Sequence, residues 1–226
     1  MSELTLSDMV VIFDLDGTLI DSAPDLTTAL NHVLGLEGLA AVEPATVRPM
    51  VGHGARALLI RGYELHGKRF PEGDEGEALV SGFIDYYAEN STVHTTLFPG
   101  AEACLDRLEE NGAALAVCTN KLERLSLPIL EGLGVRNRFA EIVCRDSLPE
   151  YKPSPLPLLE ILRRTGREKG AMIGDTMTDI NAARAAGLPA YWANFGYGVV
   201  EEGLRKNEQR FETFEALSRE ILEQMG

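Results

Sequence analysis

Four short segments of the sequence carry side chains whose types and spacing could do chemistry. They are residues 14–18, 119–120, 152–153 and 174–179. Carboxylate oxygens are ligands that Mg²⁺ prefers, so Asp14 and Asp175 are candidate metal ligands. A carboxylate is also a competent nucleophile toward phosphorus. The combination predicts a site where a divalent cation and a lysine balance clustered carboxylates and hold a phosphoryl group.

The remaining residues of these segments suit the other steps of phosphoryl transfer. Asp16 points to the other side of an extended backbone from Asp14, where it can protonate a leaving oxygen and then activate water. Gly17 allows a tight turn whose backbone N–H groups face the phosphoryl oxygens. Thr119 and Lys152 can hold the remaining oxygens.

Each segment also has an ordinary structural interpretation. Asp and Gly are turn residues, Thr119 could cap a helix, and Lys152 could be a solvated surface lysine. Asp175 and Asp179 could stabilise the start of a helix. All four segments are expected at the same end of a sheet, where the active sites of α/β proteins lie, and this shared position favours the catalytic interpretation.

The elements predicted around these segments place them together. Short apolar runs, typical of strands buried in a parallel sheet, are Met9–Phe13, Ala113–Val117, Ile142–Cys144, Ala171–Ile173 and, more weakly, Ala190–Trp192. Helical patterns lie between and after them, at Glu102–Glu110, Lys121–Leu133, Ser154–Arg164, Thr178–Ala186 and Glu212–Met225. Pro128 predicts a kink or break in the second of these helices. This alternation predicts an α/β fold with a doubly wound, Rossmann-like parallel sheet and a site at the carboxyl ends of its strands.

Residues 22–95 interrupt the alternation. Four helical patterns occur there without a buried-strand run between them: Asp25–Leu34, Pro44–Val51, Ala55–Leu65 and Glu75–Glu89. We therefore expect a catalytic core made of residues 1–21 and 96–226, with an inserted helical subdomain at residues 22–95.

In order and placement, the four segments resemble the four motifs of the haloacid dehalogenase superfamily, over essentially the whole chain. The resemblance implies a nucleophile at Asp14, an acid/base at Asp16, and a helical cap at residues 22–95. It also implies Mg²⁺ bound by Asp14, the main-chain carbonyl of Asp16 and Asp175, with Asp179 ligating through water or orienting Lys152. Catalysis is assigned to Asp14, Asp16, Thr119 and Lys152, and phosphate binding to Leu15, Asp16, Thr119, Asn120 and Lys152.

Finer features resemble the phosphoglycolate phosphatase branch of that superfamily. They are Asp21-Ser22, Val51 to Ala55, Thr119 to Lys121, Lys152 to Pro157, and Phe195 to Gly198. Leu122 departs from this pattern, which has proline there. In the predicted cap, His53, Gly54 and Arg56 are candidate substrate contacts, although a structural loop histidine and a surface arginine are equally compatible with the sequence.

The branch resemblance makes 2-phosphoglycolate the expected substrate, hydrolysed through an aspartyl-phosphate. A sugar phosphatase, a pyrophosphatase, a phosphomutase and a non-catalytic phosphometabolite-binding regulator are the alternatives. A Schiff-base phosphonate hydrolase would use a cap lysine where this chain has His53, and the dehalogenases lack the aspartate present at Asp16.

Composition narrows the classes of partner. The formal net charge of the 226 residues is −14, which disfavours binding to nucleic acid and to anionic membranes. Cys104, Cys118 and Cys144 have no metal-ligand spacing, and the N-terminus has no basic region, so we expect reduced thiols and a cytoplasmic protein. The expected partner is a small phosphorylated metabolite, and the expected oligomeric state is a monomer or homodimer.

Overall fold

A six-stranded sheet forms the centre of the computed structural model, which describes residues 6–199 and 203–225. Its strand order is β5-β4-β1-β6-β7-β8, and every neighbouring pair is parallel. The strands are β1 (Met9–Phe13), β4 (Ala114–Cys118), β5 (Glu141–Val143), β6 (Lys169–Gly174), β7 (Ala190–Ala193) and β8 (Glu208–Phe211). The predicted α/β fold is therefore confirmed. The sequence did not indicate β8, because this last strand of the sheet is half-exposed and carries no continuous apolar run.

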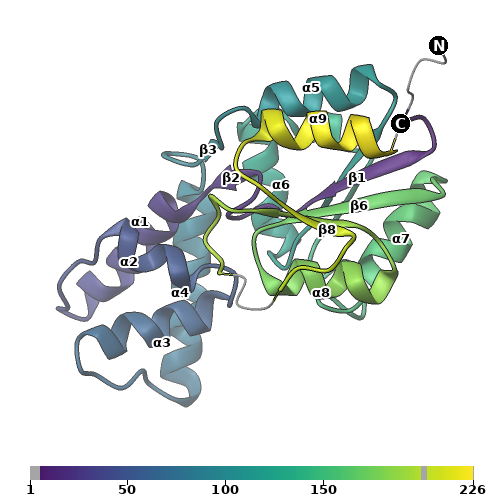
Figure 1. The fold of residues 1–226 in the computed structure, drawn as a ribbon. Coiled ribbons are helices and arrows are strands. Elements are labelled where there is room, and N and C mark those ends of the chain that lie inside the picture. Colours follow the sequence, from purple (N-terminus) through teal and green to yellow (C-terminus); the bar gives the residue numbers. More distant parts are fainter. Residues whose placement is uncertain (1–5, 200–202, 226) are drawn as a thin grey trace, which may run out of the picture.

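Helices cover both faces of the sheet, as expected for a doubly wound fold (Figure 1). Alternate residues of β1 enter different cores: Val11 packs in the core that contains residues of α5, α6 and α9, and Ile12 in the core that contains residues of α7 and α8. These helices are α5 (Ala101–Glu110), α6 (Glu123–Gly132), α7 (Leu156–Thr165), α8 (Met177–Ala186) and α9 (Phe214–Met225). A short 3₁₀ helix, η2 (Arg136–Arg138), follows α6.

Helix α6 differs from its predicted form at its start. It begins at Glu123 rather than Lys121, because Leu122 has an extended backbone at the N-cap. Thr119 to Lys121 are thereby left in a loop at the end of β4. Pro128 lies inside the helix without splitting it.

The helices of residues 23–90 lie to one side of the sheet (Figure 1). They are α1 (Ala23–Leu36), α2 (Pro44–Val47), the 3₁₀ helix η1 (Arg48–Met50), α3 (Ala55–Leu65) and α4 (Gly73–Asn90). Two short strands that the sequence did not indicate, β2 (Ile20–Asp21) and β3 (Thr96–Leu97), pair antiparallel where the chain enters and leaves this segment. The assignment of residues 22–95 as a cap stays a prediction.

Asp25 joins the two ends of this helical segment. Its buried carboxylate accepts hydrogen bonds from the backbone N–H groups of His94 and Thr95, at 2.9–3.0 Å, and from the Thr95 hydroxyl at 2.8 Å. Because a buried carboxylate is costly unless it is hydrogen-bonded, these contacts fix the start of α1 against the returning chain.

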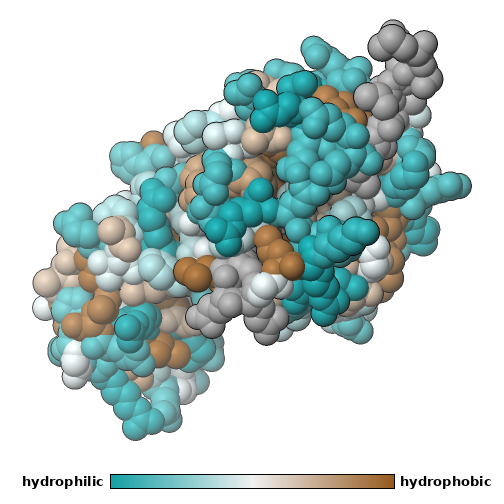
Figure 2. All heavy atoms as spheres, in the orientation of Figure 1, coloured by the Kyte–Doolittle hydropathy of each residue, from teal (hydrophilic) through white to brown (hydrophobic). Residues whose placement is uncertain are grey.

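Hydrophilic residues cover most of the face shown in Figure 2, and hydrophobic residues form small separate patches there. Within the described part of the chain, no helix combines the length and apolar character needed to cross a membrane. The three cysteines are free and buried. Burial raises the pKa of the Cys104 and Cys118 thiols to about 12.

Candidate active site

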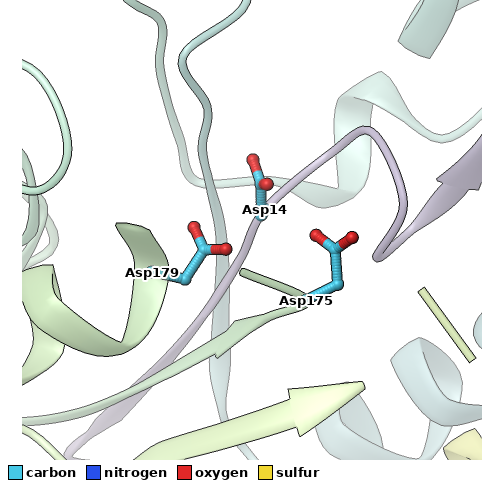
Figure 3. Close-up of side chains that lie close together, drawn as sticks. All are labelled: Asp14, Asp175 and Asp179. Atoms are coloured by element: carbon cyan, nitrogen blue, oxygen red, sulfur yellow. The ribbon is translucent and has the colours of Figure 1, made fainter. Parts of the chain in front are cut away.

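Three carboxylates converge at the carboxyl ends of β1 and β6. Asp14 follows β1, Asp175 follows β6, and Asp179 lies in the first turn of α8. One oxygen of each lies within 4.8 Å of the others, and Figure 3 shows the three carboxylates turned to the same side. The structure thus brings together Asp14, Asp175 and Asp179, which the sequence analysis expects at one end of the sheet, while their catalytic roles stay predictions.

Lys152 lies beside this cluster. Its Nζ is 2.9 Å from Asp14 Oδ1 and 2.6 Å from Asp179 Oδ1, and its side chain is 1% exposed. Burial alone would lower the pKa of Lys152, but Asp14 and Asp179 outweigh it and raise that pKa. The lysine therefore stays charged and neutralises part of the cluster.

The protein groups alone leave the site short of positive charge. Burial, opposed by Lys152, raises the pKa of Asp14 to about 6. Burial and the neighbouring aspartates raise the pKa of Asp175 to about 7. Both shifts indicate carboxylates that a bound cation would stabilise in the charged form.

The donor set fits a hard divalent cation. One oxygen of Asp179 is committed to Lys152 at 2.6 Å, and the other accepts from the Thr176 N–H and hydroxyl in a capping box. Asp175 accepts from Thr18 and from the N–H groups of Tyr197 and Gly198. Asp175 and Asp179 thus each accept three hydrogen bonds, one of which at Asp179 orients Lys152. Asp14 pairs with Lys152 through Oδ1 and has the most free ligand capacity of the three.

Glycines let the backbone approach Asp175 closely. Gly17 has φ +82°, and a Cβ there would lie 2.4 Å from Asp175 Oδ2. A Cβ at Gly196 would lie 2.2 Å from Asp175 Cβ. Side chains at these two positions would therefore displace the Asp175 carboxylate.

Asp16 does not join the three-aspartate cluster. Both of its oxygens lie 3.0 Å from Lys121 Nζ, and Oδ1 also accepts from the Ser22 hydroxyl. Lys121 Nζ in turn lies 3.0 Å from the hydroxyl of Tyr87 on α4. The sequence analysis assigns Lys121 no role at the site and names it only among the features shared with the phosphoglycolate phosphatase branch. Its position directly after Thr119 and Asn120 is the sequence feature that could have indicated a role.

The remaining predicted core residues lie at the same end of the sheet. Thr119 is buried, and its hydroxyl accepts from the Lys121 N–H at 3.2 Å. Asn120 Nδ2 donates to the Lys152 carbonyl at 2.8 Å, while its buried Oδ1 has no hydrogen-bond partner in the described part of the chain. Asn120 thus holds the segment that carries Lys152. The Leu15 side chain is fully buried, so only its backbone can face the site.

A cavity of about 660 Å³ connects the carboxylates with the helical segment. Its wall includes Asp14 and Lys152, the segment from Gly52 to Arg56 that leads into α3, and apolar residues of α3 and α4 such as Leu58 and Phe83. His53 Nδ1 lies 3.4 Å from the Met50 carbonyl. Arg56 forms an ion pair with Glu77 and lies 5.7 Å from the Phe70 ring centroid. The three residues predicted as substrate contacts therefore line the cavity, and Arg56 already has a carboxylate partner.

Comparison with known proteins shows the family to which the chain belongs. The model of the family described as haloacid dehalogenase-like hydrolase matches residues 11–193. The chain belongs to this family. The haloacid dehalogenase-like hydrolases to which it is similar include a phosphoglycolate phosphatase of Mesorhizobium japonicum, 38% identical over 97% of each chain. Another phosphoglycolate phosphatase, from Agrobacterium fabrum, is 37% identical over 96% of this chain and 93% of that protein.

Solved structures show the same fold. A crystal structure described as a predicted phosphoglycolate phosphatase of Haemophilus somnus superposes with a TM-score of 0.83 and 30% identity, over 94% of this chain and 97% of that one. The Rossmann-type core expected for this hydrolase family is therefore shown both by its topology and by similarity.

Proposed function

We propose that this hydrolase is a Mg²⁺-dependent phosphatase that cleaves a small phosphate monoester through an aspartyl-phosphate on Asp14. The observation that carries the proposal is the position of Asp14. It lies within 4.8 Å of Asp175, 2.9 Å from Lys152, and on the wall of a cavity large enough for a metabolite.

Asp14, Asp175 and the main-chain carbonyl of Asp16 would hold the ion, with Asp179 orienting Lys152 or ligating through water. A bound Mg²⁺ would neutralise charge on the phosphoryl oxygens and on the carboxylates around them. Thr119 and Lys152, with the backbone N–H groups of Leu15 and Asp16, would hold the phosphoryl oxygens.

The chemical steps follow from two carboxylates with different surroundings. One oxygen of Asp14 attacks phosphorus, the bond to the leaving oxygen breaks, and Asp16 gives that oxygen a proton. Asp16 then takes a proton from water, whose oxygen attacks the phosphorus of the aspartyl-phosphate. Inorganic phosphate leaves, and the Asp14 carboxylate is regenerated.

The proposed substrate is 2-phosphoglycolate. The support is the shared name of the curated relatives, which match nearly the full length of this chain. A sugar phosphatase, a pyrophosphatase and a phosphomutase would use the same residues to bind the metal and the phosphoryl group. They would differ in the residues that surround the rest of the substrate. A regulator without activity is the least favoured candidate, because the described residues include a complete set of the expected core groups.

Release of inorganic phosphate from a panel of esters tests the proposal. The panel contains 2-phosphoglycolate, sugar phosphates, pyrophosphate and 4-nitrophenyl phosphate, each assayed with Mg²⁺ and with chelator. Asp14→Asn should lose activity by about 10³-fold or more, because the nucleophile is gone. Asp8→Asn is the matched control, since Asp8 lies in the loop before β1 and pairs with the exposed Lys169.

Metal-dependent release that Asp14→Asn abolishes and Asp8→Asn retains would support the mechanism. Equal activity in Asp14→Asn and wild type would refute it. Preference for another ester of the panel would keep the mechanism and change the substrate.

A further inference from the structure

Among the described residues, four lysine and arginine side chains line the cavity, and three of them pair with carboxylates. Lys152 contacts Asp14 and Asp179, Lys121 contacts Asp16, and Arg56 contacts Glu77. The fourth is Arg145, in the loop after β5. Within residues 6–199 and 203–225, no carboxylate oxygen lies within 4.0 Å of its guanidinium nitrogens.

The loop holds Arg145 in a defined place beside the catalytic residues. The Arg145 N–H donates to the Lys121 carbonyl at 3.1 Å. Its guanidinium carbon lies 4.2 Å from the centroid of the Tyr151 ring. When the face of a guanidinium packs on an aromatic ring, its N–H groups, which lie in the guanidinium plane, can still donate hydrogen bonds to a ligand.

The nearest acidic residue in the sequence does not neutralise Arg145. Asp146 instead accepts the N–H of Glu123 at 2.9 Å, at the start of α6. The turn is closed by Ser147, whose hydroxyl accepts the Cys144 N–H at 2.9 Å and whose own N–H donates to the Cys144 carbonyl. A half-buried arginine is thus presented to the cavity without a counterion among the residues that the structure describes.

We propose that Arg145 is a specificity-determining residue that binds a carboxylate on the organic part of the substrate. The proposal rests on the proposed phosphatase function and specifies its substrate class: phosphate monoesters that carry a second, carboxylate anion. Arginine matches a carboxylate through two parallel N–H···O bonds. The other three cations that line the cavity already pair with protein carboxylates. The carboxylate of a bound substrate would therefore interact most favourably with Arg145.

The test compares two esters that differ at the group Arg145 would bind. 2-Phosphoglycolate carries a carboxylate, and 2-hydroxyethyl phosphate carries a hydroxymethyl group in its place. Arg145→Met should raise KM for 2-phosphoglycolate by about 10- to 100-fold, as expected for a lost charge-assisted pair. The kcat/KM ratio between the two esters should fall by the same factor, and Arg145→Lys should restore part of it.

Two further arginine variants complete the design. Arg136→Met is the matched control, because Arg136 is exposed, pairs with Glu131 and lies outside this cavity; both esters should be unaffected. Arg56→Met tests the alternative that Arg56, at the start of α3, binds the carboxylate. A selective loss in Arg56→Met but not in Arg145→Met would assign the carboxylate to Arg56 and overturn the proposal, as would an equal effect of Arg145→Met on both esters.

A binding measurement separates this proposal from the phosphatase mechanism. Calorimetric titration of 2-phosphoglycolate with Mg²⁺ into Asp14→Asn, with and without Arg145→Met, needs no turnover. If wild type hydrolyses no ester, the proposed function fails. Weaker binding with Arg145→Met would still support the carboxylate site, and unchanged or absent binding would overturn it.

Discussion

The ammonium nitrogen of Lys121 lies 3.0 Å from each carboxylate oxygen of Asp16. The Lys121 side chain is only 6% exposed, and the Tyr87 hydroxyl from α4 lies 3.0 Å from the same nitrogen. Burial would lower the pKa of Lys121, but Asp16 and Tyr87 outweigh it and raise that pKa. The proposed acid/base is therefore oriented by a permanent cation that also contacts the helical segment.

Lys121→Met should lower kcat/KM for an alkyl phosphate by about 10²-fold, because a misplaced Asp16 no longer protonates the leaving oxygen efficiently. The loss of kcat/KM should be much smaller for 4-nitrophenyl phosphate, whose leaving group needs no proton, because kcat/KM reports formation of the aspartyl-phosphate and not its hydrolysis. Steady-state kinetics with both esters measures the difference, and Asp16→Asn should show the same pattern. Equal losses for the two esters would mean that Lys121 has another role.

Lys152→Met should destabilise the metal-free protein by about 3–5 kcal/mol, because it leaves Asp14 and Asp179 buried without their cation. The matched control is Lys169→Met, which breaks the exposed pair with Asp8 and should cost about 1 kcal/mol or less. Urea unfolding in chelator measures both. Similar values for the two variants would contradict a charge-neutralising role for Lys152.

Stability of the metal-free protein should fall as the pH rises from about 4 to about 7. The folded-state pKa values of Asp14 and Asp175, about 6 and about 7, lie above their ordinary value of 3.8. The folded protein therefore binds protons that the unfolded chain has lost, and this contribution disappears as each carboxyl ionises. Thermal unfolding in chelator across this range measures the trend.

Added Mg²⁺ should reverse that loss, and its stabilising effect should grow with pH, because protons compete with the ion for the carboxylates. The comparison is thermal unfolding with Mg²⁺ and with chelator at each pH. A Mg²⁺ effect that does not change across the range would contradict binding by Asp14 and Asp175.

Gly17→Ala should weaken Mg²⁺ binding and reduce phosphatase activity, because its Cβ would lie 2.4 Å from Asp175 Oδ2. Gly38→Ala is the control: Gly38 also has positive φ, at +65°, but a Cβ there would have no atom within 4 Å. Both variants carry backbone strain of about 1–2 kcal/mol, so the difference between them isolates the contact with Asp175. Mg²⁺ titration by calorimetry would reveal it, and equal affinities would rule the contact out.

Sequence patterns predicted the parts of this structure that depend on local order. Continuous apolar runs located β1 and β6, and the residues directly after them are Asp14 and Asp175. Parallel strands bring such residues to one edge, so the convergence of the carboxylates followed from topology. The charged and half-exposed residues of β8 form no such run, and this strand was missed.

Contacts between side chains distant in the sequence could not be predicted in the same way. Lys121 and Asp16 are 105 residues apart, and Lys121 and Tyr87 are 34 apart. Their meeting depends on how α4 lies against the loop after β4. The Tyr197 hydroxyl, which donates to Asp21 at 2.6 Å and accepts the Ala23 N–H, is a further case.

The order of the strands in the sheet affects how the chain can fold while it is being synthesised. On one side β1 pairs with β4, beginning at Val10 with Ala114, and on the other it pairs with β6, beginning at Met9 with Lys169. Within the sheet, β1 is synthesised before both of its neighbours, and the whole helical segment is synthesised between β1 and β4. One edge of β1 therefore stays unpaired until Cys118 has been made and the other until Gly174 has been made, and exposed strands are prone to aggregate during this time. Asp14 can meet Asp175 only after β6 has been made, so the candidate active site forms later than any of the strands β1, β4 and β5.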